Sequence, residues 1–349
     1  MADNSIMSTI KRKNLDEVSF IRPILIVLLV LVHSFTVFND GWPPFEGFVP
    51  CEAYKWISRF SYSFMLETFI FVSGYVYAFQ KFELGKNDSF KKLLSKKAQR
   101  LLFPSIVFSI LYAQLINGNN LLDSAHIGAS FLSVLSGVGH MWYLPVLLWC
   151  FVAIYLVNKV RLNKGLLLFA FGIMAILPLP SLPFQLYRLP YYFFFFYLGQ
   201  VFWLNREKYF SKLPLKKIIT IWLVFVLVFV GLRIVKANVM ELADGNVPLL
   251  QKITFNIISK SCQIVYATLG MTAIYVTGIF VTSKYKLPDW YIRLGNLCFG
   301  VYIFQEFILK YLYYFSELPK SCPPYIIPWV CFIITIVLSL CLSKATKDL

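Results

Sequence analysis

Two ionisable side chains, Arg22 and His33, lie in the first long apolar segment of the chain and are separated by ten residues. An α-helix turns by about 100° per residue, so both side chains return to nearly the same helix face, with about 16 Å of rise between them. Ionisable groups inside a membrane are functional candidates because their desolvation is costly, and histidine exchanges protons near neutral pH. Alternatively, Arg22 snorkels to lipid phosphates and His33 is a hydrogen-bonded core or interfacial histidine.

A basic pair, Lys97 and Arg100, stands three residues apart and shortly before Pro104. We expect both side chains on one face of a helix that begins here at the cytoplasmic side, where free N–H groups and the helix dipole also favour anions. This arrangement suits a phosphorylated cytosolic ligand. An equally simple interpretation is a basic flank that only sets the orientation of the chain in the membrane.

A carboxylate and a hydroxyl interrupt the second apolar segment. Glu67 needs a partner, because an unpaired carboxylate in an apolar environment is unfavourable, and Lys260 is a candidate partner of Glu67 or of Glu306. Ser73 is followed by Gly74, and small residues of this kind let helices approach closely. We therefore expect Ser73 to serve mainly helix packing.

Other polar groups lie at the start of one later apolar segment and inside another. His140 and Trp142 have the composition of an interfacial aromatic belt, although His140 could also face the same external cavity as His33. Tyr302 and Glu306 are spaced as neighbours on one helix face. We count all four as supporting candidates.

The composition indicates which elements must hold these residues. Of 349 residues, 58% are hydrophobic and 14% are charged, and the mean hydropathy is +0.68. Soluble domains have about 45–50% hydrophobic and about 25% charged residues. These values exclude a soluble enzyme, a disordered chain and a nucleic-acid-binding domain. Because backbone groups that face lipid must be satisfied within their own segment, we predict an all-α, polytopic membrane helix bundle.

About ten transmembrane helices are predicted, with both termini cytoplasmic. In this orientation the inner segments hold 23 Lys and Arg residues and the outer loops hold 8, as expected for the positive-inside rule. Without repeats or linkers, residues 19–343 form one transmembrane domain between cytoplasmic tails at 1–18 and 344–349. The predicted spans are 19–38, 60–80, 101–118, 141–158, 164–180, 186–204, 216–235, 253–281, 291–315 and 324–343.

The seven cysteines form no CxxC pair and have no companion histidines, so no metal site is predicted. Most lie in apolar runs as small core residues. A bridge between Cys51 and Cys322 stays open, because both lie in predicted outer loops. The first apolar segment lacks a cleavage pattern of small residues, so we expect it to be a retained signal anchor.

Together these motifs resemble the acyltransferase-3 family, integral-membrane proteins that acylate sugars and other hydroxyl acceptors. The resemblance covers residues 16–343, with two departures. Lys97 stands where arginine is more usual, which keeps the charge and loses the bidentate fork; Gln305 replaces a histidine of many relatives, which shifts attention to Glu306. The matching motifs are Arg22-x10-His33, Phe71-Val72-Ser73-Gly74-Tyr75, Lys97 to Pro104, His140-Met141-Trp142-Tyr143-Leu144, Tyr197-Leu198-Gly199 and Phe299 to Phe304.

The resemblance implies transfer of an acyl group, usually acetyl, from cytosolic acyl-CoA to a hydroxyl of a surface glycan or its lipid-linked precursor. Lys97 and Arg100 would bind the donor, with Arg22 as a further candidate for its phosphates. His33, with Arg22 on the same helix face, would serve the catalytic step as a general base or as a covalent carrier of the acyl group.

The same resemblance implies a multi-pass protein of the cell (inner or plasma) membrane, in contact with membrane lipids. Acetyl-CoA or another acyl-CoA would be a co-substrate, and no bound cofactor, metal or nucleic acid is expected. The acyl group, the acceptor and the oligomeric state stay open. The alternative function is a transporter or flippase for a glycan or acyl group, which predicts inverted repeats; the sequence shows none.

Overall fold

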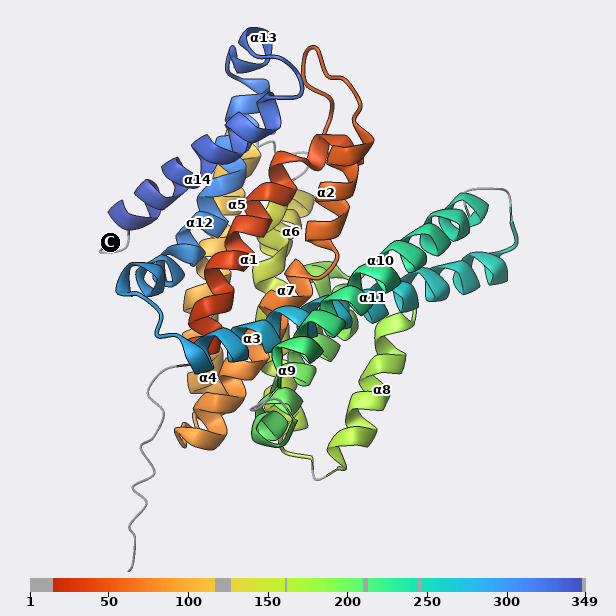
Figure 1. The fold of residues 1–349 in the computed structure, drawn as a ribbon, viewed down its shortest axis with the longest axis vertical. Helices are drawn as coiled ribbons and strands as arrows, with labels where there is room; N and C mark the ends of the chain where they lie inside the picture. The colour runs from red at the N-terminus through yellow and green to blue at the C-terminus, as the bar shows by residue number, and fades with distance from the viewer. Residues whose placement is uncertain (1–14, 117–126, 161, 210–212, 244–246, 347–349) are drawn as a thin grey trace, which may run out of the picture.

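The computed structural model describes residues 15–116, 127–160, 162–209, 213–243 and 247–346. These residues contain helices and no β-strand (Figure 1), which confirms the predicted all-α fold class. The α-helices are α1 (Asp16–Ser34), α2 (Glu52–Tyr62), α3 (Met65–Ala78), α4 (Phe90–Lys97), α5 (Phe103–Leu115), α6 (Ile127–Ser136), α7 (Tyr143–Val157), α8 (Lys164–Ile176), α9 (Leu189–Tyr209), α10 (Leu215–Ala243), α11 (Leu249–Lys284), α12 (Asp289–Tyr314), α13 (Leu318–Ser321) and α14 (Ile327–Ala345).

Each predicted span overlaps one of these helices. Among the described residues, seven helical segments are long and apolar enough to cross a membrane, so the protein is a multi-pass helix bundle. α3 and α8, with 14 and 13 residues, are shorter than the roughly 20 residues of a full span. The count of ten and the cytoplasmic termini stay predictions, and most of both tails lies outside the described residues. The seven segments are Asp16–Ser34, Phe90–Leu115, Gly139–Val157, Leu215–Val239, Leu249–Lys284, Asp289–Tyr314 and Ile327–Ala345.

The basic pair lies inside a helix rather than at its start. α4 begins directly after its capping residue, Ser89, and a π-helical turn, η3 (Ala98–Leu102), joins α4 to α5. The expectation of free N–H groups beside Lys97 and Arg100 is therefore wrong. Pro104 marks the first turn of α5 behind the π-turn, where its missing N–H is tolerated, and not the beginning of the whole helix.

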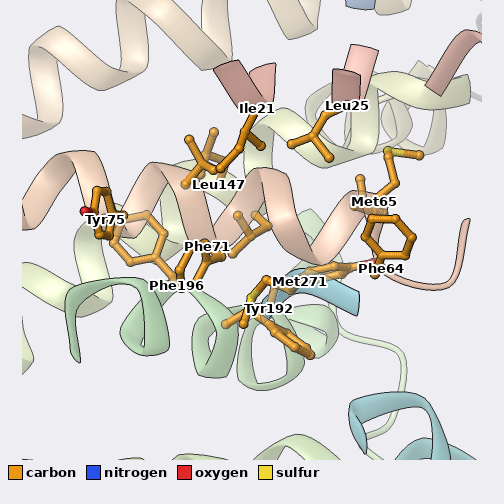
Figure 2. Close-up of a cluster of buried hydrophobic side chains, with 14 of the residues drawn as sticks. Ile21, Leu25, Phe64, Met65, Phe71, Tyr75, Leu147, Tyr192, Phe196 and Met271 are labelled. Carbon is orange, nitrogen blue, oxygen red and sulfur yellow. The ribbon is translucent and has the colours of Figure 1, made fainter. Parts of the chain in front are cut away.

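Two glycines bring the backbones of α3 and α9 into contact. A Cβ atom on Gly74 would fall on the carbonyl oxygen of Phe196, and a Cβ atom on Gly199 would fall on that of Phe71. Small residues permit this approach, so the packing role expected for the segment around Gly74 is confirmed. Figure 2 shows Phe71 and Phe196 among the buried side chains of the hydrophobic core.

Helix α1 runs through the middle of the bundle. It packs against α12, α11, α2, α14 and α3, and Figure 1 shows it, in red, between α12 and α2. Arg22 lies near the N-terminal end of α1 and His33 near its C-terminal end. The neighbours of α1 therefore decide what surrounds each of these two residues.

Candidate functional site

A cavity of about 450 Å³, the inner cavity, lies beside the N-terminal half of α1. Its walls come from α1, α3, α7, α12 and the helix that contains η3. Arg22, Lys97 and Arg100 all line it, although they come from separate parts of the sequence. Ser73 of α3 and Tyr302 of α12 line it as well. Its volume is in the range of small-molecule sites.

The inner cavity is positively charged. Among the described residues no carboxylate lines it, and none forms an ion pair with its three cations. Lys97 Nζ lies 3.7 Å from the centre of the Phe151 ring, a cation–π contact. Three positive charges around one space attract an anion, and they can donate charge-assisted hydrogen bonds to phosphate oxygens.

A second cavity of about 750 Å³, the outer cavity, lies at the C-terminal end of α1. His33, His140, Trp142 and Glu306 line it. The interpretation of His140 as a belt residue is wrong, because its side chain is buried, with 6% exposed, and faces the same cavity as His33. The short helical turn η4 (Gly139–Trp142) carries it there.

His33 has one ring nitrogen held by the protein. Its Nδ1 lies 2.8 Å from Oε1 of Gln305, a residue of α12 that is completely buried. A carbonyl oxygen only accepts, so Nδ1 carries the proton and Nε2 keeps its lone pair. No described residue hydrogen-bonds to Nε2. His33 therefore presents the nitrogen needed for proton abstraction.

Both ring nitrogens of His140 lie close to oxygen atoms of α12. Nδ1 lies 2.9 Å from Oε2 of Glu306, and Nε2 lies 3.1 Å from the carbonyl oxygen of Ile303. The Tyr112 hydroxyl donates to the other oxygen of Glu306 at 2.6 Å. The centres of the His33 and His140 rings are 6.4 Å apart. His140 and Glu306 thus form a fixed polar wall beside His33.

The two cavities lie beside successive stretches of α1. On α1, Leu29 lines the inner cavity and Val32 the outer one, so about one helical turn separates them. Tyr302 lines the inner cavity, and its hydroxyl donates at 2.6 Å to the carbonyl oxygen of His140, which lines the outer cavity.

A basic cavity about one helical turn along α1 from the cavity of a histidine with a free nitrogen is suited to group transfer from an anionic donor. The family model for an acyltransferase domain matches residues 15–346, nearly the whole chain. The chain belongs to the acyltransferase-3 family. The predicted family is therefore confirmed, and the protein is a membrane acyltransferase. No curated protein and no solved structure matches it.

Glu67 of this acyltransferase-3 protein lines neither cavity. Its carboxylate accepts a hydrogen bond of 2.6 Å from the Tyr191 hydroxyl. Lys260 Nζ donates to the carbonyl oxygen of Leu177 at 2.9 Å, so the expected pairing of Lys260 with Glu67 or Glu306 is wrong. Tyr191 and His140 contact those two carboxylates instead, and Oε2 of Glu67 is buried without a hydrogen-bond partner.

The remaining expected residues lie close to the cavities of the acyltransferase-3 fold. Ser73 lines the inner cavity and donates its hydroxyl to the carbonyl oxygen of Phe69 at 3.0 Å. Trp142 lines the outer cavity with the Arg188 guanidinium 4.0 Å from the centre of its ring.

Cys51 and Cys322 are both free thiols, so the bridge left open by the sequence is not formed.

Sequence reasoning did not identify several residues of this acyltransferase site. Gln305 was set aside because it departs from the family motif, yet it contacts His33. Tyr112 was one of 21 tyrosines, without a signal of its own. Four cations of the outer cavity were counted only as loop charges; they are Arg59, Arg233, Lys236 and Lys310.

Proposed function

We propose that this protein transfers an acetyl group from cytosolic acetyl-CoA to a hydroxyl of a cell-surface glycan or of its lipid-linked precursor. The inner cavity binds the donor and the outer cavity binds the acceptor. The observation that carries this proposal is His33, which lines the outer cavity about one helical turn from the inner one and whose Nε2 has no hydrogen-bond partner among the described residues.

The donor binds through its phosphates. Arg100, Lys97 and Arg22 supply three cations that no carboxylate of the described lining neutralises. With the phosphates held there, the pantetheine arm extends along α1 toward Tyr302 and places the thioester near His33. Positioning both reactants in this way removes a large part of the entropy of activation.

Transfer then proceeds as general-base catalysis. His33 Nε2 takes the proton of the acceptor hydroxyl while that oxygen attacks the thioester carbonyl carbon. The C–S bond breaks, the CoA thiolate leaves, and the proton held by His33 is available to it. The products are an O-acetyl ester and CoA, with no other reactant consumed. Gln305 keeps Nδ1 protonated throughout, which fixes the tautomer that the step requires.

Mass spectrometry of surface glycans tests the proposal. Cells that express the protein are compared with cells that lack it and with cells that express His33→Ala at the same membrane level. We expect a glycan mass increase of one acetyl unit only with the unaltered protein. Glycans of identical mass in all three strains would overturn the proposal, and an increase by a larger acyl unit would replace acetyl as the transferred group.

A further inference from the structure

Four cations converge on the outer cavity from three helices. Arg59 comes from α2, Arg233 and Lys236 come from α10, and Lys310 comes from α12. All four are half-buried. The only carboxylate in the described lining is that of Glu306, which His140 and Tyr112 already contact. The cavity therefore has a clear excess of positive charge.

None of these cations forms an ion pair among the described residues. Lys236 Nζ contacts Oε1 of Gln263 at 3.2 Å, and Lys310 Nζ lies 4.1 Å from the centre of the Trp42 ring. Arg59 Nε is buried and has no hydrogen-bond partner.

Two acidic residues lie near Arg59 without neutralising it. Asp40 and Glu52 are close enough to act on its charge, but neither lines the cavity, and Glu52 pairs with Lys55 at 3.3 Å. Arg59 lines the cavity, and its Nε–H group is available to a ligand there.

The four cations of the outer cavity are not needed to set the orientation of the protein in the membrane. These four are among the 8 Lys and Arg residues that the charge count places in outer loops, where the positive-inside rule makes positive charge unnecessary. Half-buried cations without an ion-pair partner lower stability unless a ligand neutralises them. Their convergence on one cavity therefore indicates a ligand of opposite charge.

We infer that the outer cavity binds an acceptor that is itself an anion, a saccharide bearing a carboxylate or a phosphate close to the hydroxyl that is acylated. Guanidinium and ammonium groups give strong charge-assisted hydrogen bonds to both anions. Trp42 also lines this cavity, with Lys310 Nζ 4.1 Å from its ring centre and the His33 ring 6.0 Å away, and its aromatic ring is suited to packing against a sugar ring. This inference rests on the proposed function and specifies its acceptor.

A binding experiment with two matched probes tests the inference. The full-length protein in phosphatidylcholine nanodiscs is titrated with nitrophenyl glucuronide and with nitrophenyl glucoside, which differ only in a carboxylate against a hydroxymethyl group. We expect the glucuronide to bind at least about tenfold more tightly, as one charge-assisted contact would give. Glucose 1-phosphate against glucose repeats the comparison for a phosphate.

Variants locate the effect. Arg233→Gln and Lys236→Gln should each reduce the preference for the anionic probe by about tenfold. Lys252→Gln, which removes another predicted outer lysine that lines neither cavity, should keep it. Equal affinity for the charged and neutral probes, or an unchanged preference in both cavity variants with unaltered thermal unfolding, would overturn the inference.

Lipid composition identifies the source of the anion. If phosphatidylglycerol in the nanodiscs displaces the glucuronide, the cavity takes a lipid-borne head group; if it does not, the charge belongs to the saccharide. The glycan mass experiment keeps the two proposals apart. Acetylated glycans without any anion preference would refute only this inference, whereas anion preference without acetylated glycans would refute the proposed function.

Discussion

His33 lines the outer cavity, with Nδ1 hydrogen-bonded to Gln305 and Nε2 without a hydrogen-bond partner among the described residues. His33→Ala should therefore insert and fold normally but lose acyl transfer by about 10²–10⁴-fold, the usual contribution of a general base. The measurement is the rate of acetyl transfer at saturating acetyl-CoA, with CoA affinity as a control that should not change. Transfer within about tenfold of the unaltered protein would contradict this role.

Gln305 is a positioning residue, because it acts through Nδ1 of His33. Gln305→Met keeps the length of the side chain and removes the carbonyl oxygen, so the imidazole loses its preferred tautomer. We expect kcat to fall by roughly 10–100-fold, the range seen when a supporting hydrogen bond to a functional histidine is removed, with KM for acetyl-CoA unchanged. Gln305→Glu restores an acceptor and should recover most of kcat; equal losses in both variants would indicate a packing role only.

At the residue scale, the sequence predicted contacts within one helix better than contacts between helices. Helical spacing alone placed Arg22 and His33 on one face of α1. The contact between His33 and Gln305 joins residues 272 positions apart, and no spacing rule connects them. His140 was misjudged for the same reason, because only the packing of α12 against η4 brings Glu306 to it.

At the element scale, the helix from α4 to α5 supplies two of the three cations that the proposal assigns to donor binding. Arg100 lies within the π-turn η3 and lines the inner cavity. Arg100→Ala should weaken CoA binding by about tenfold through lost charge-assisted phosphate contacts, and Lys97→Ala should weaken it less. Affinity for CoA in detergent is the measurement, with Lys91→Ala of the exposed face of α4 as the control. An unchanged Kd for Arg100→Ala would mean that Lys97 and Arg100 only set the orientation of the chain in the membrane.

The α3–α9 contact gives a stability prediction. Gly199→Ala should lower the unfolding temperature and the folded yield, because the new Cβ would collide with the Phe71 backbone. Gly231→Ala in α10 is the matched control, since nothing lies within 4 Å of its Cβ position, and there the higher helix propensity of alanine should be neutral or stabilising. Similar thermal unfolding of both variants would show that α3 and α9 separate at little cost.

Element positions were largely predictable because long apolar runs mark membrane helices directly. The boundaries were not. The start expected at residue 101 is the middle of a continuous helix, since the sequence signal of Pro104 is the same at a helix start and behind a π-turn. The short polar helix α2 was read as an outer loop, and with it the cavity role of Arg59 was missed.

For the whole molecule, the two cavities impose a direction on the reaction. Under the proposed function, the donor enters at the N-terminal end of α1, the acceptor binds at its C-terminal end, and the acyl group passes Tyr302 between them. The proposed acyl-CoA donor is cytosolic, so this proposal requires the inner cavity to face the cytoplasm. This requirement agrees with the 23 inner against 8 outer basic residues of the predicted topology.

Accessibility of single cysteines tests that direction. In a variant without the seven native cysteines, Asn87→Cys lies exposed in the loop before α4, and Glu46→Cys lies exposed in the loop that carries Trp42 of the outer cavity. An impermeant maleimide added to intact cells should label Glu46→Cys and should label Asn87→Cys only after the membrane is opened. The reverse pattern would place the basic inner cavity outside the cell, where no acyl-CoA is available, and the transfer path from Arg100 to His33 would have to be abandoned.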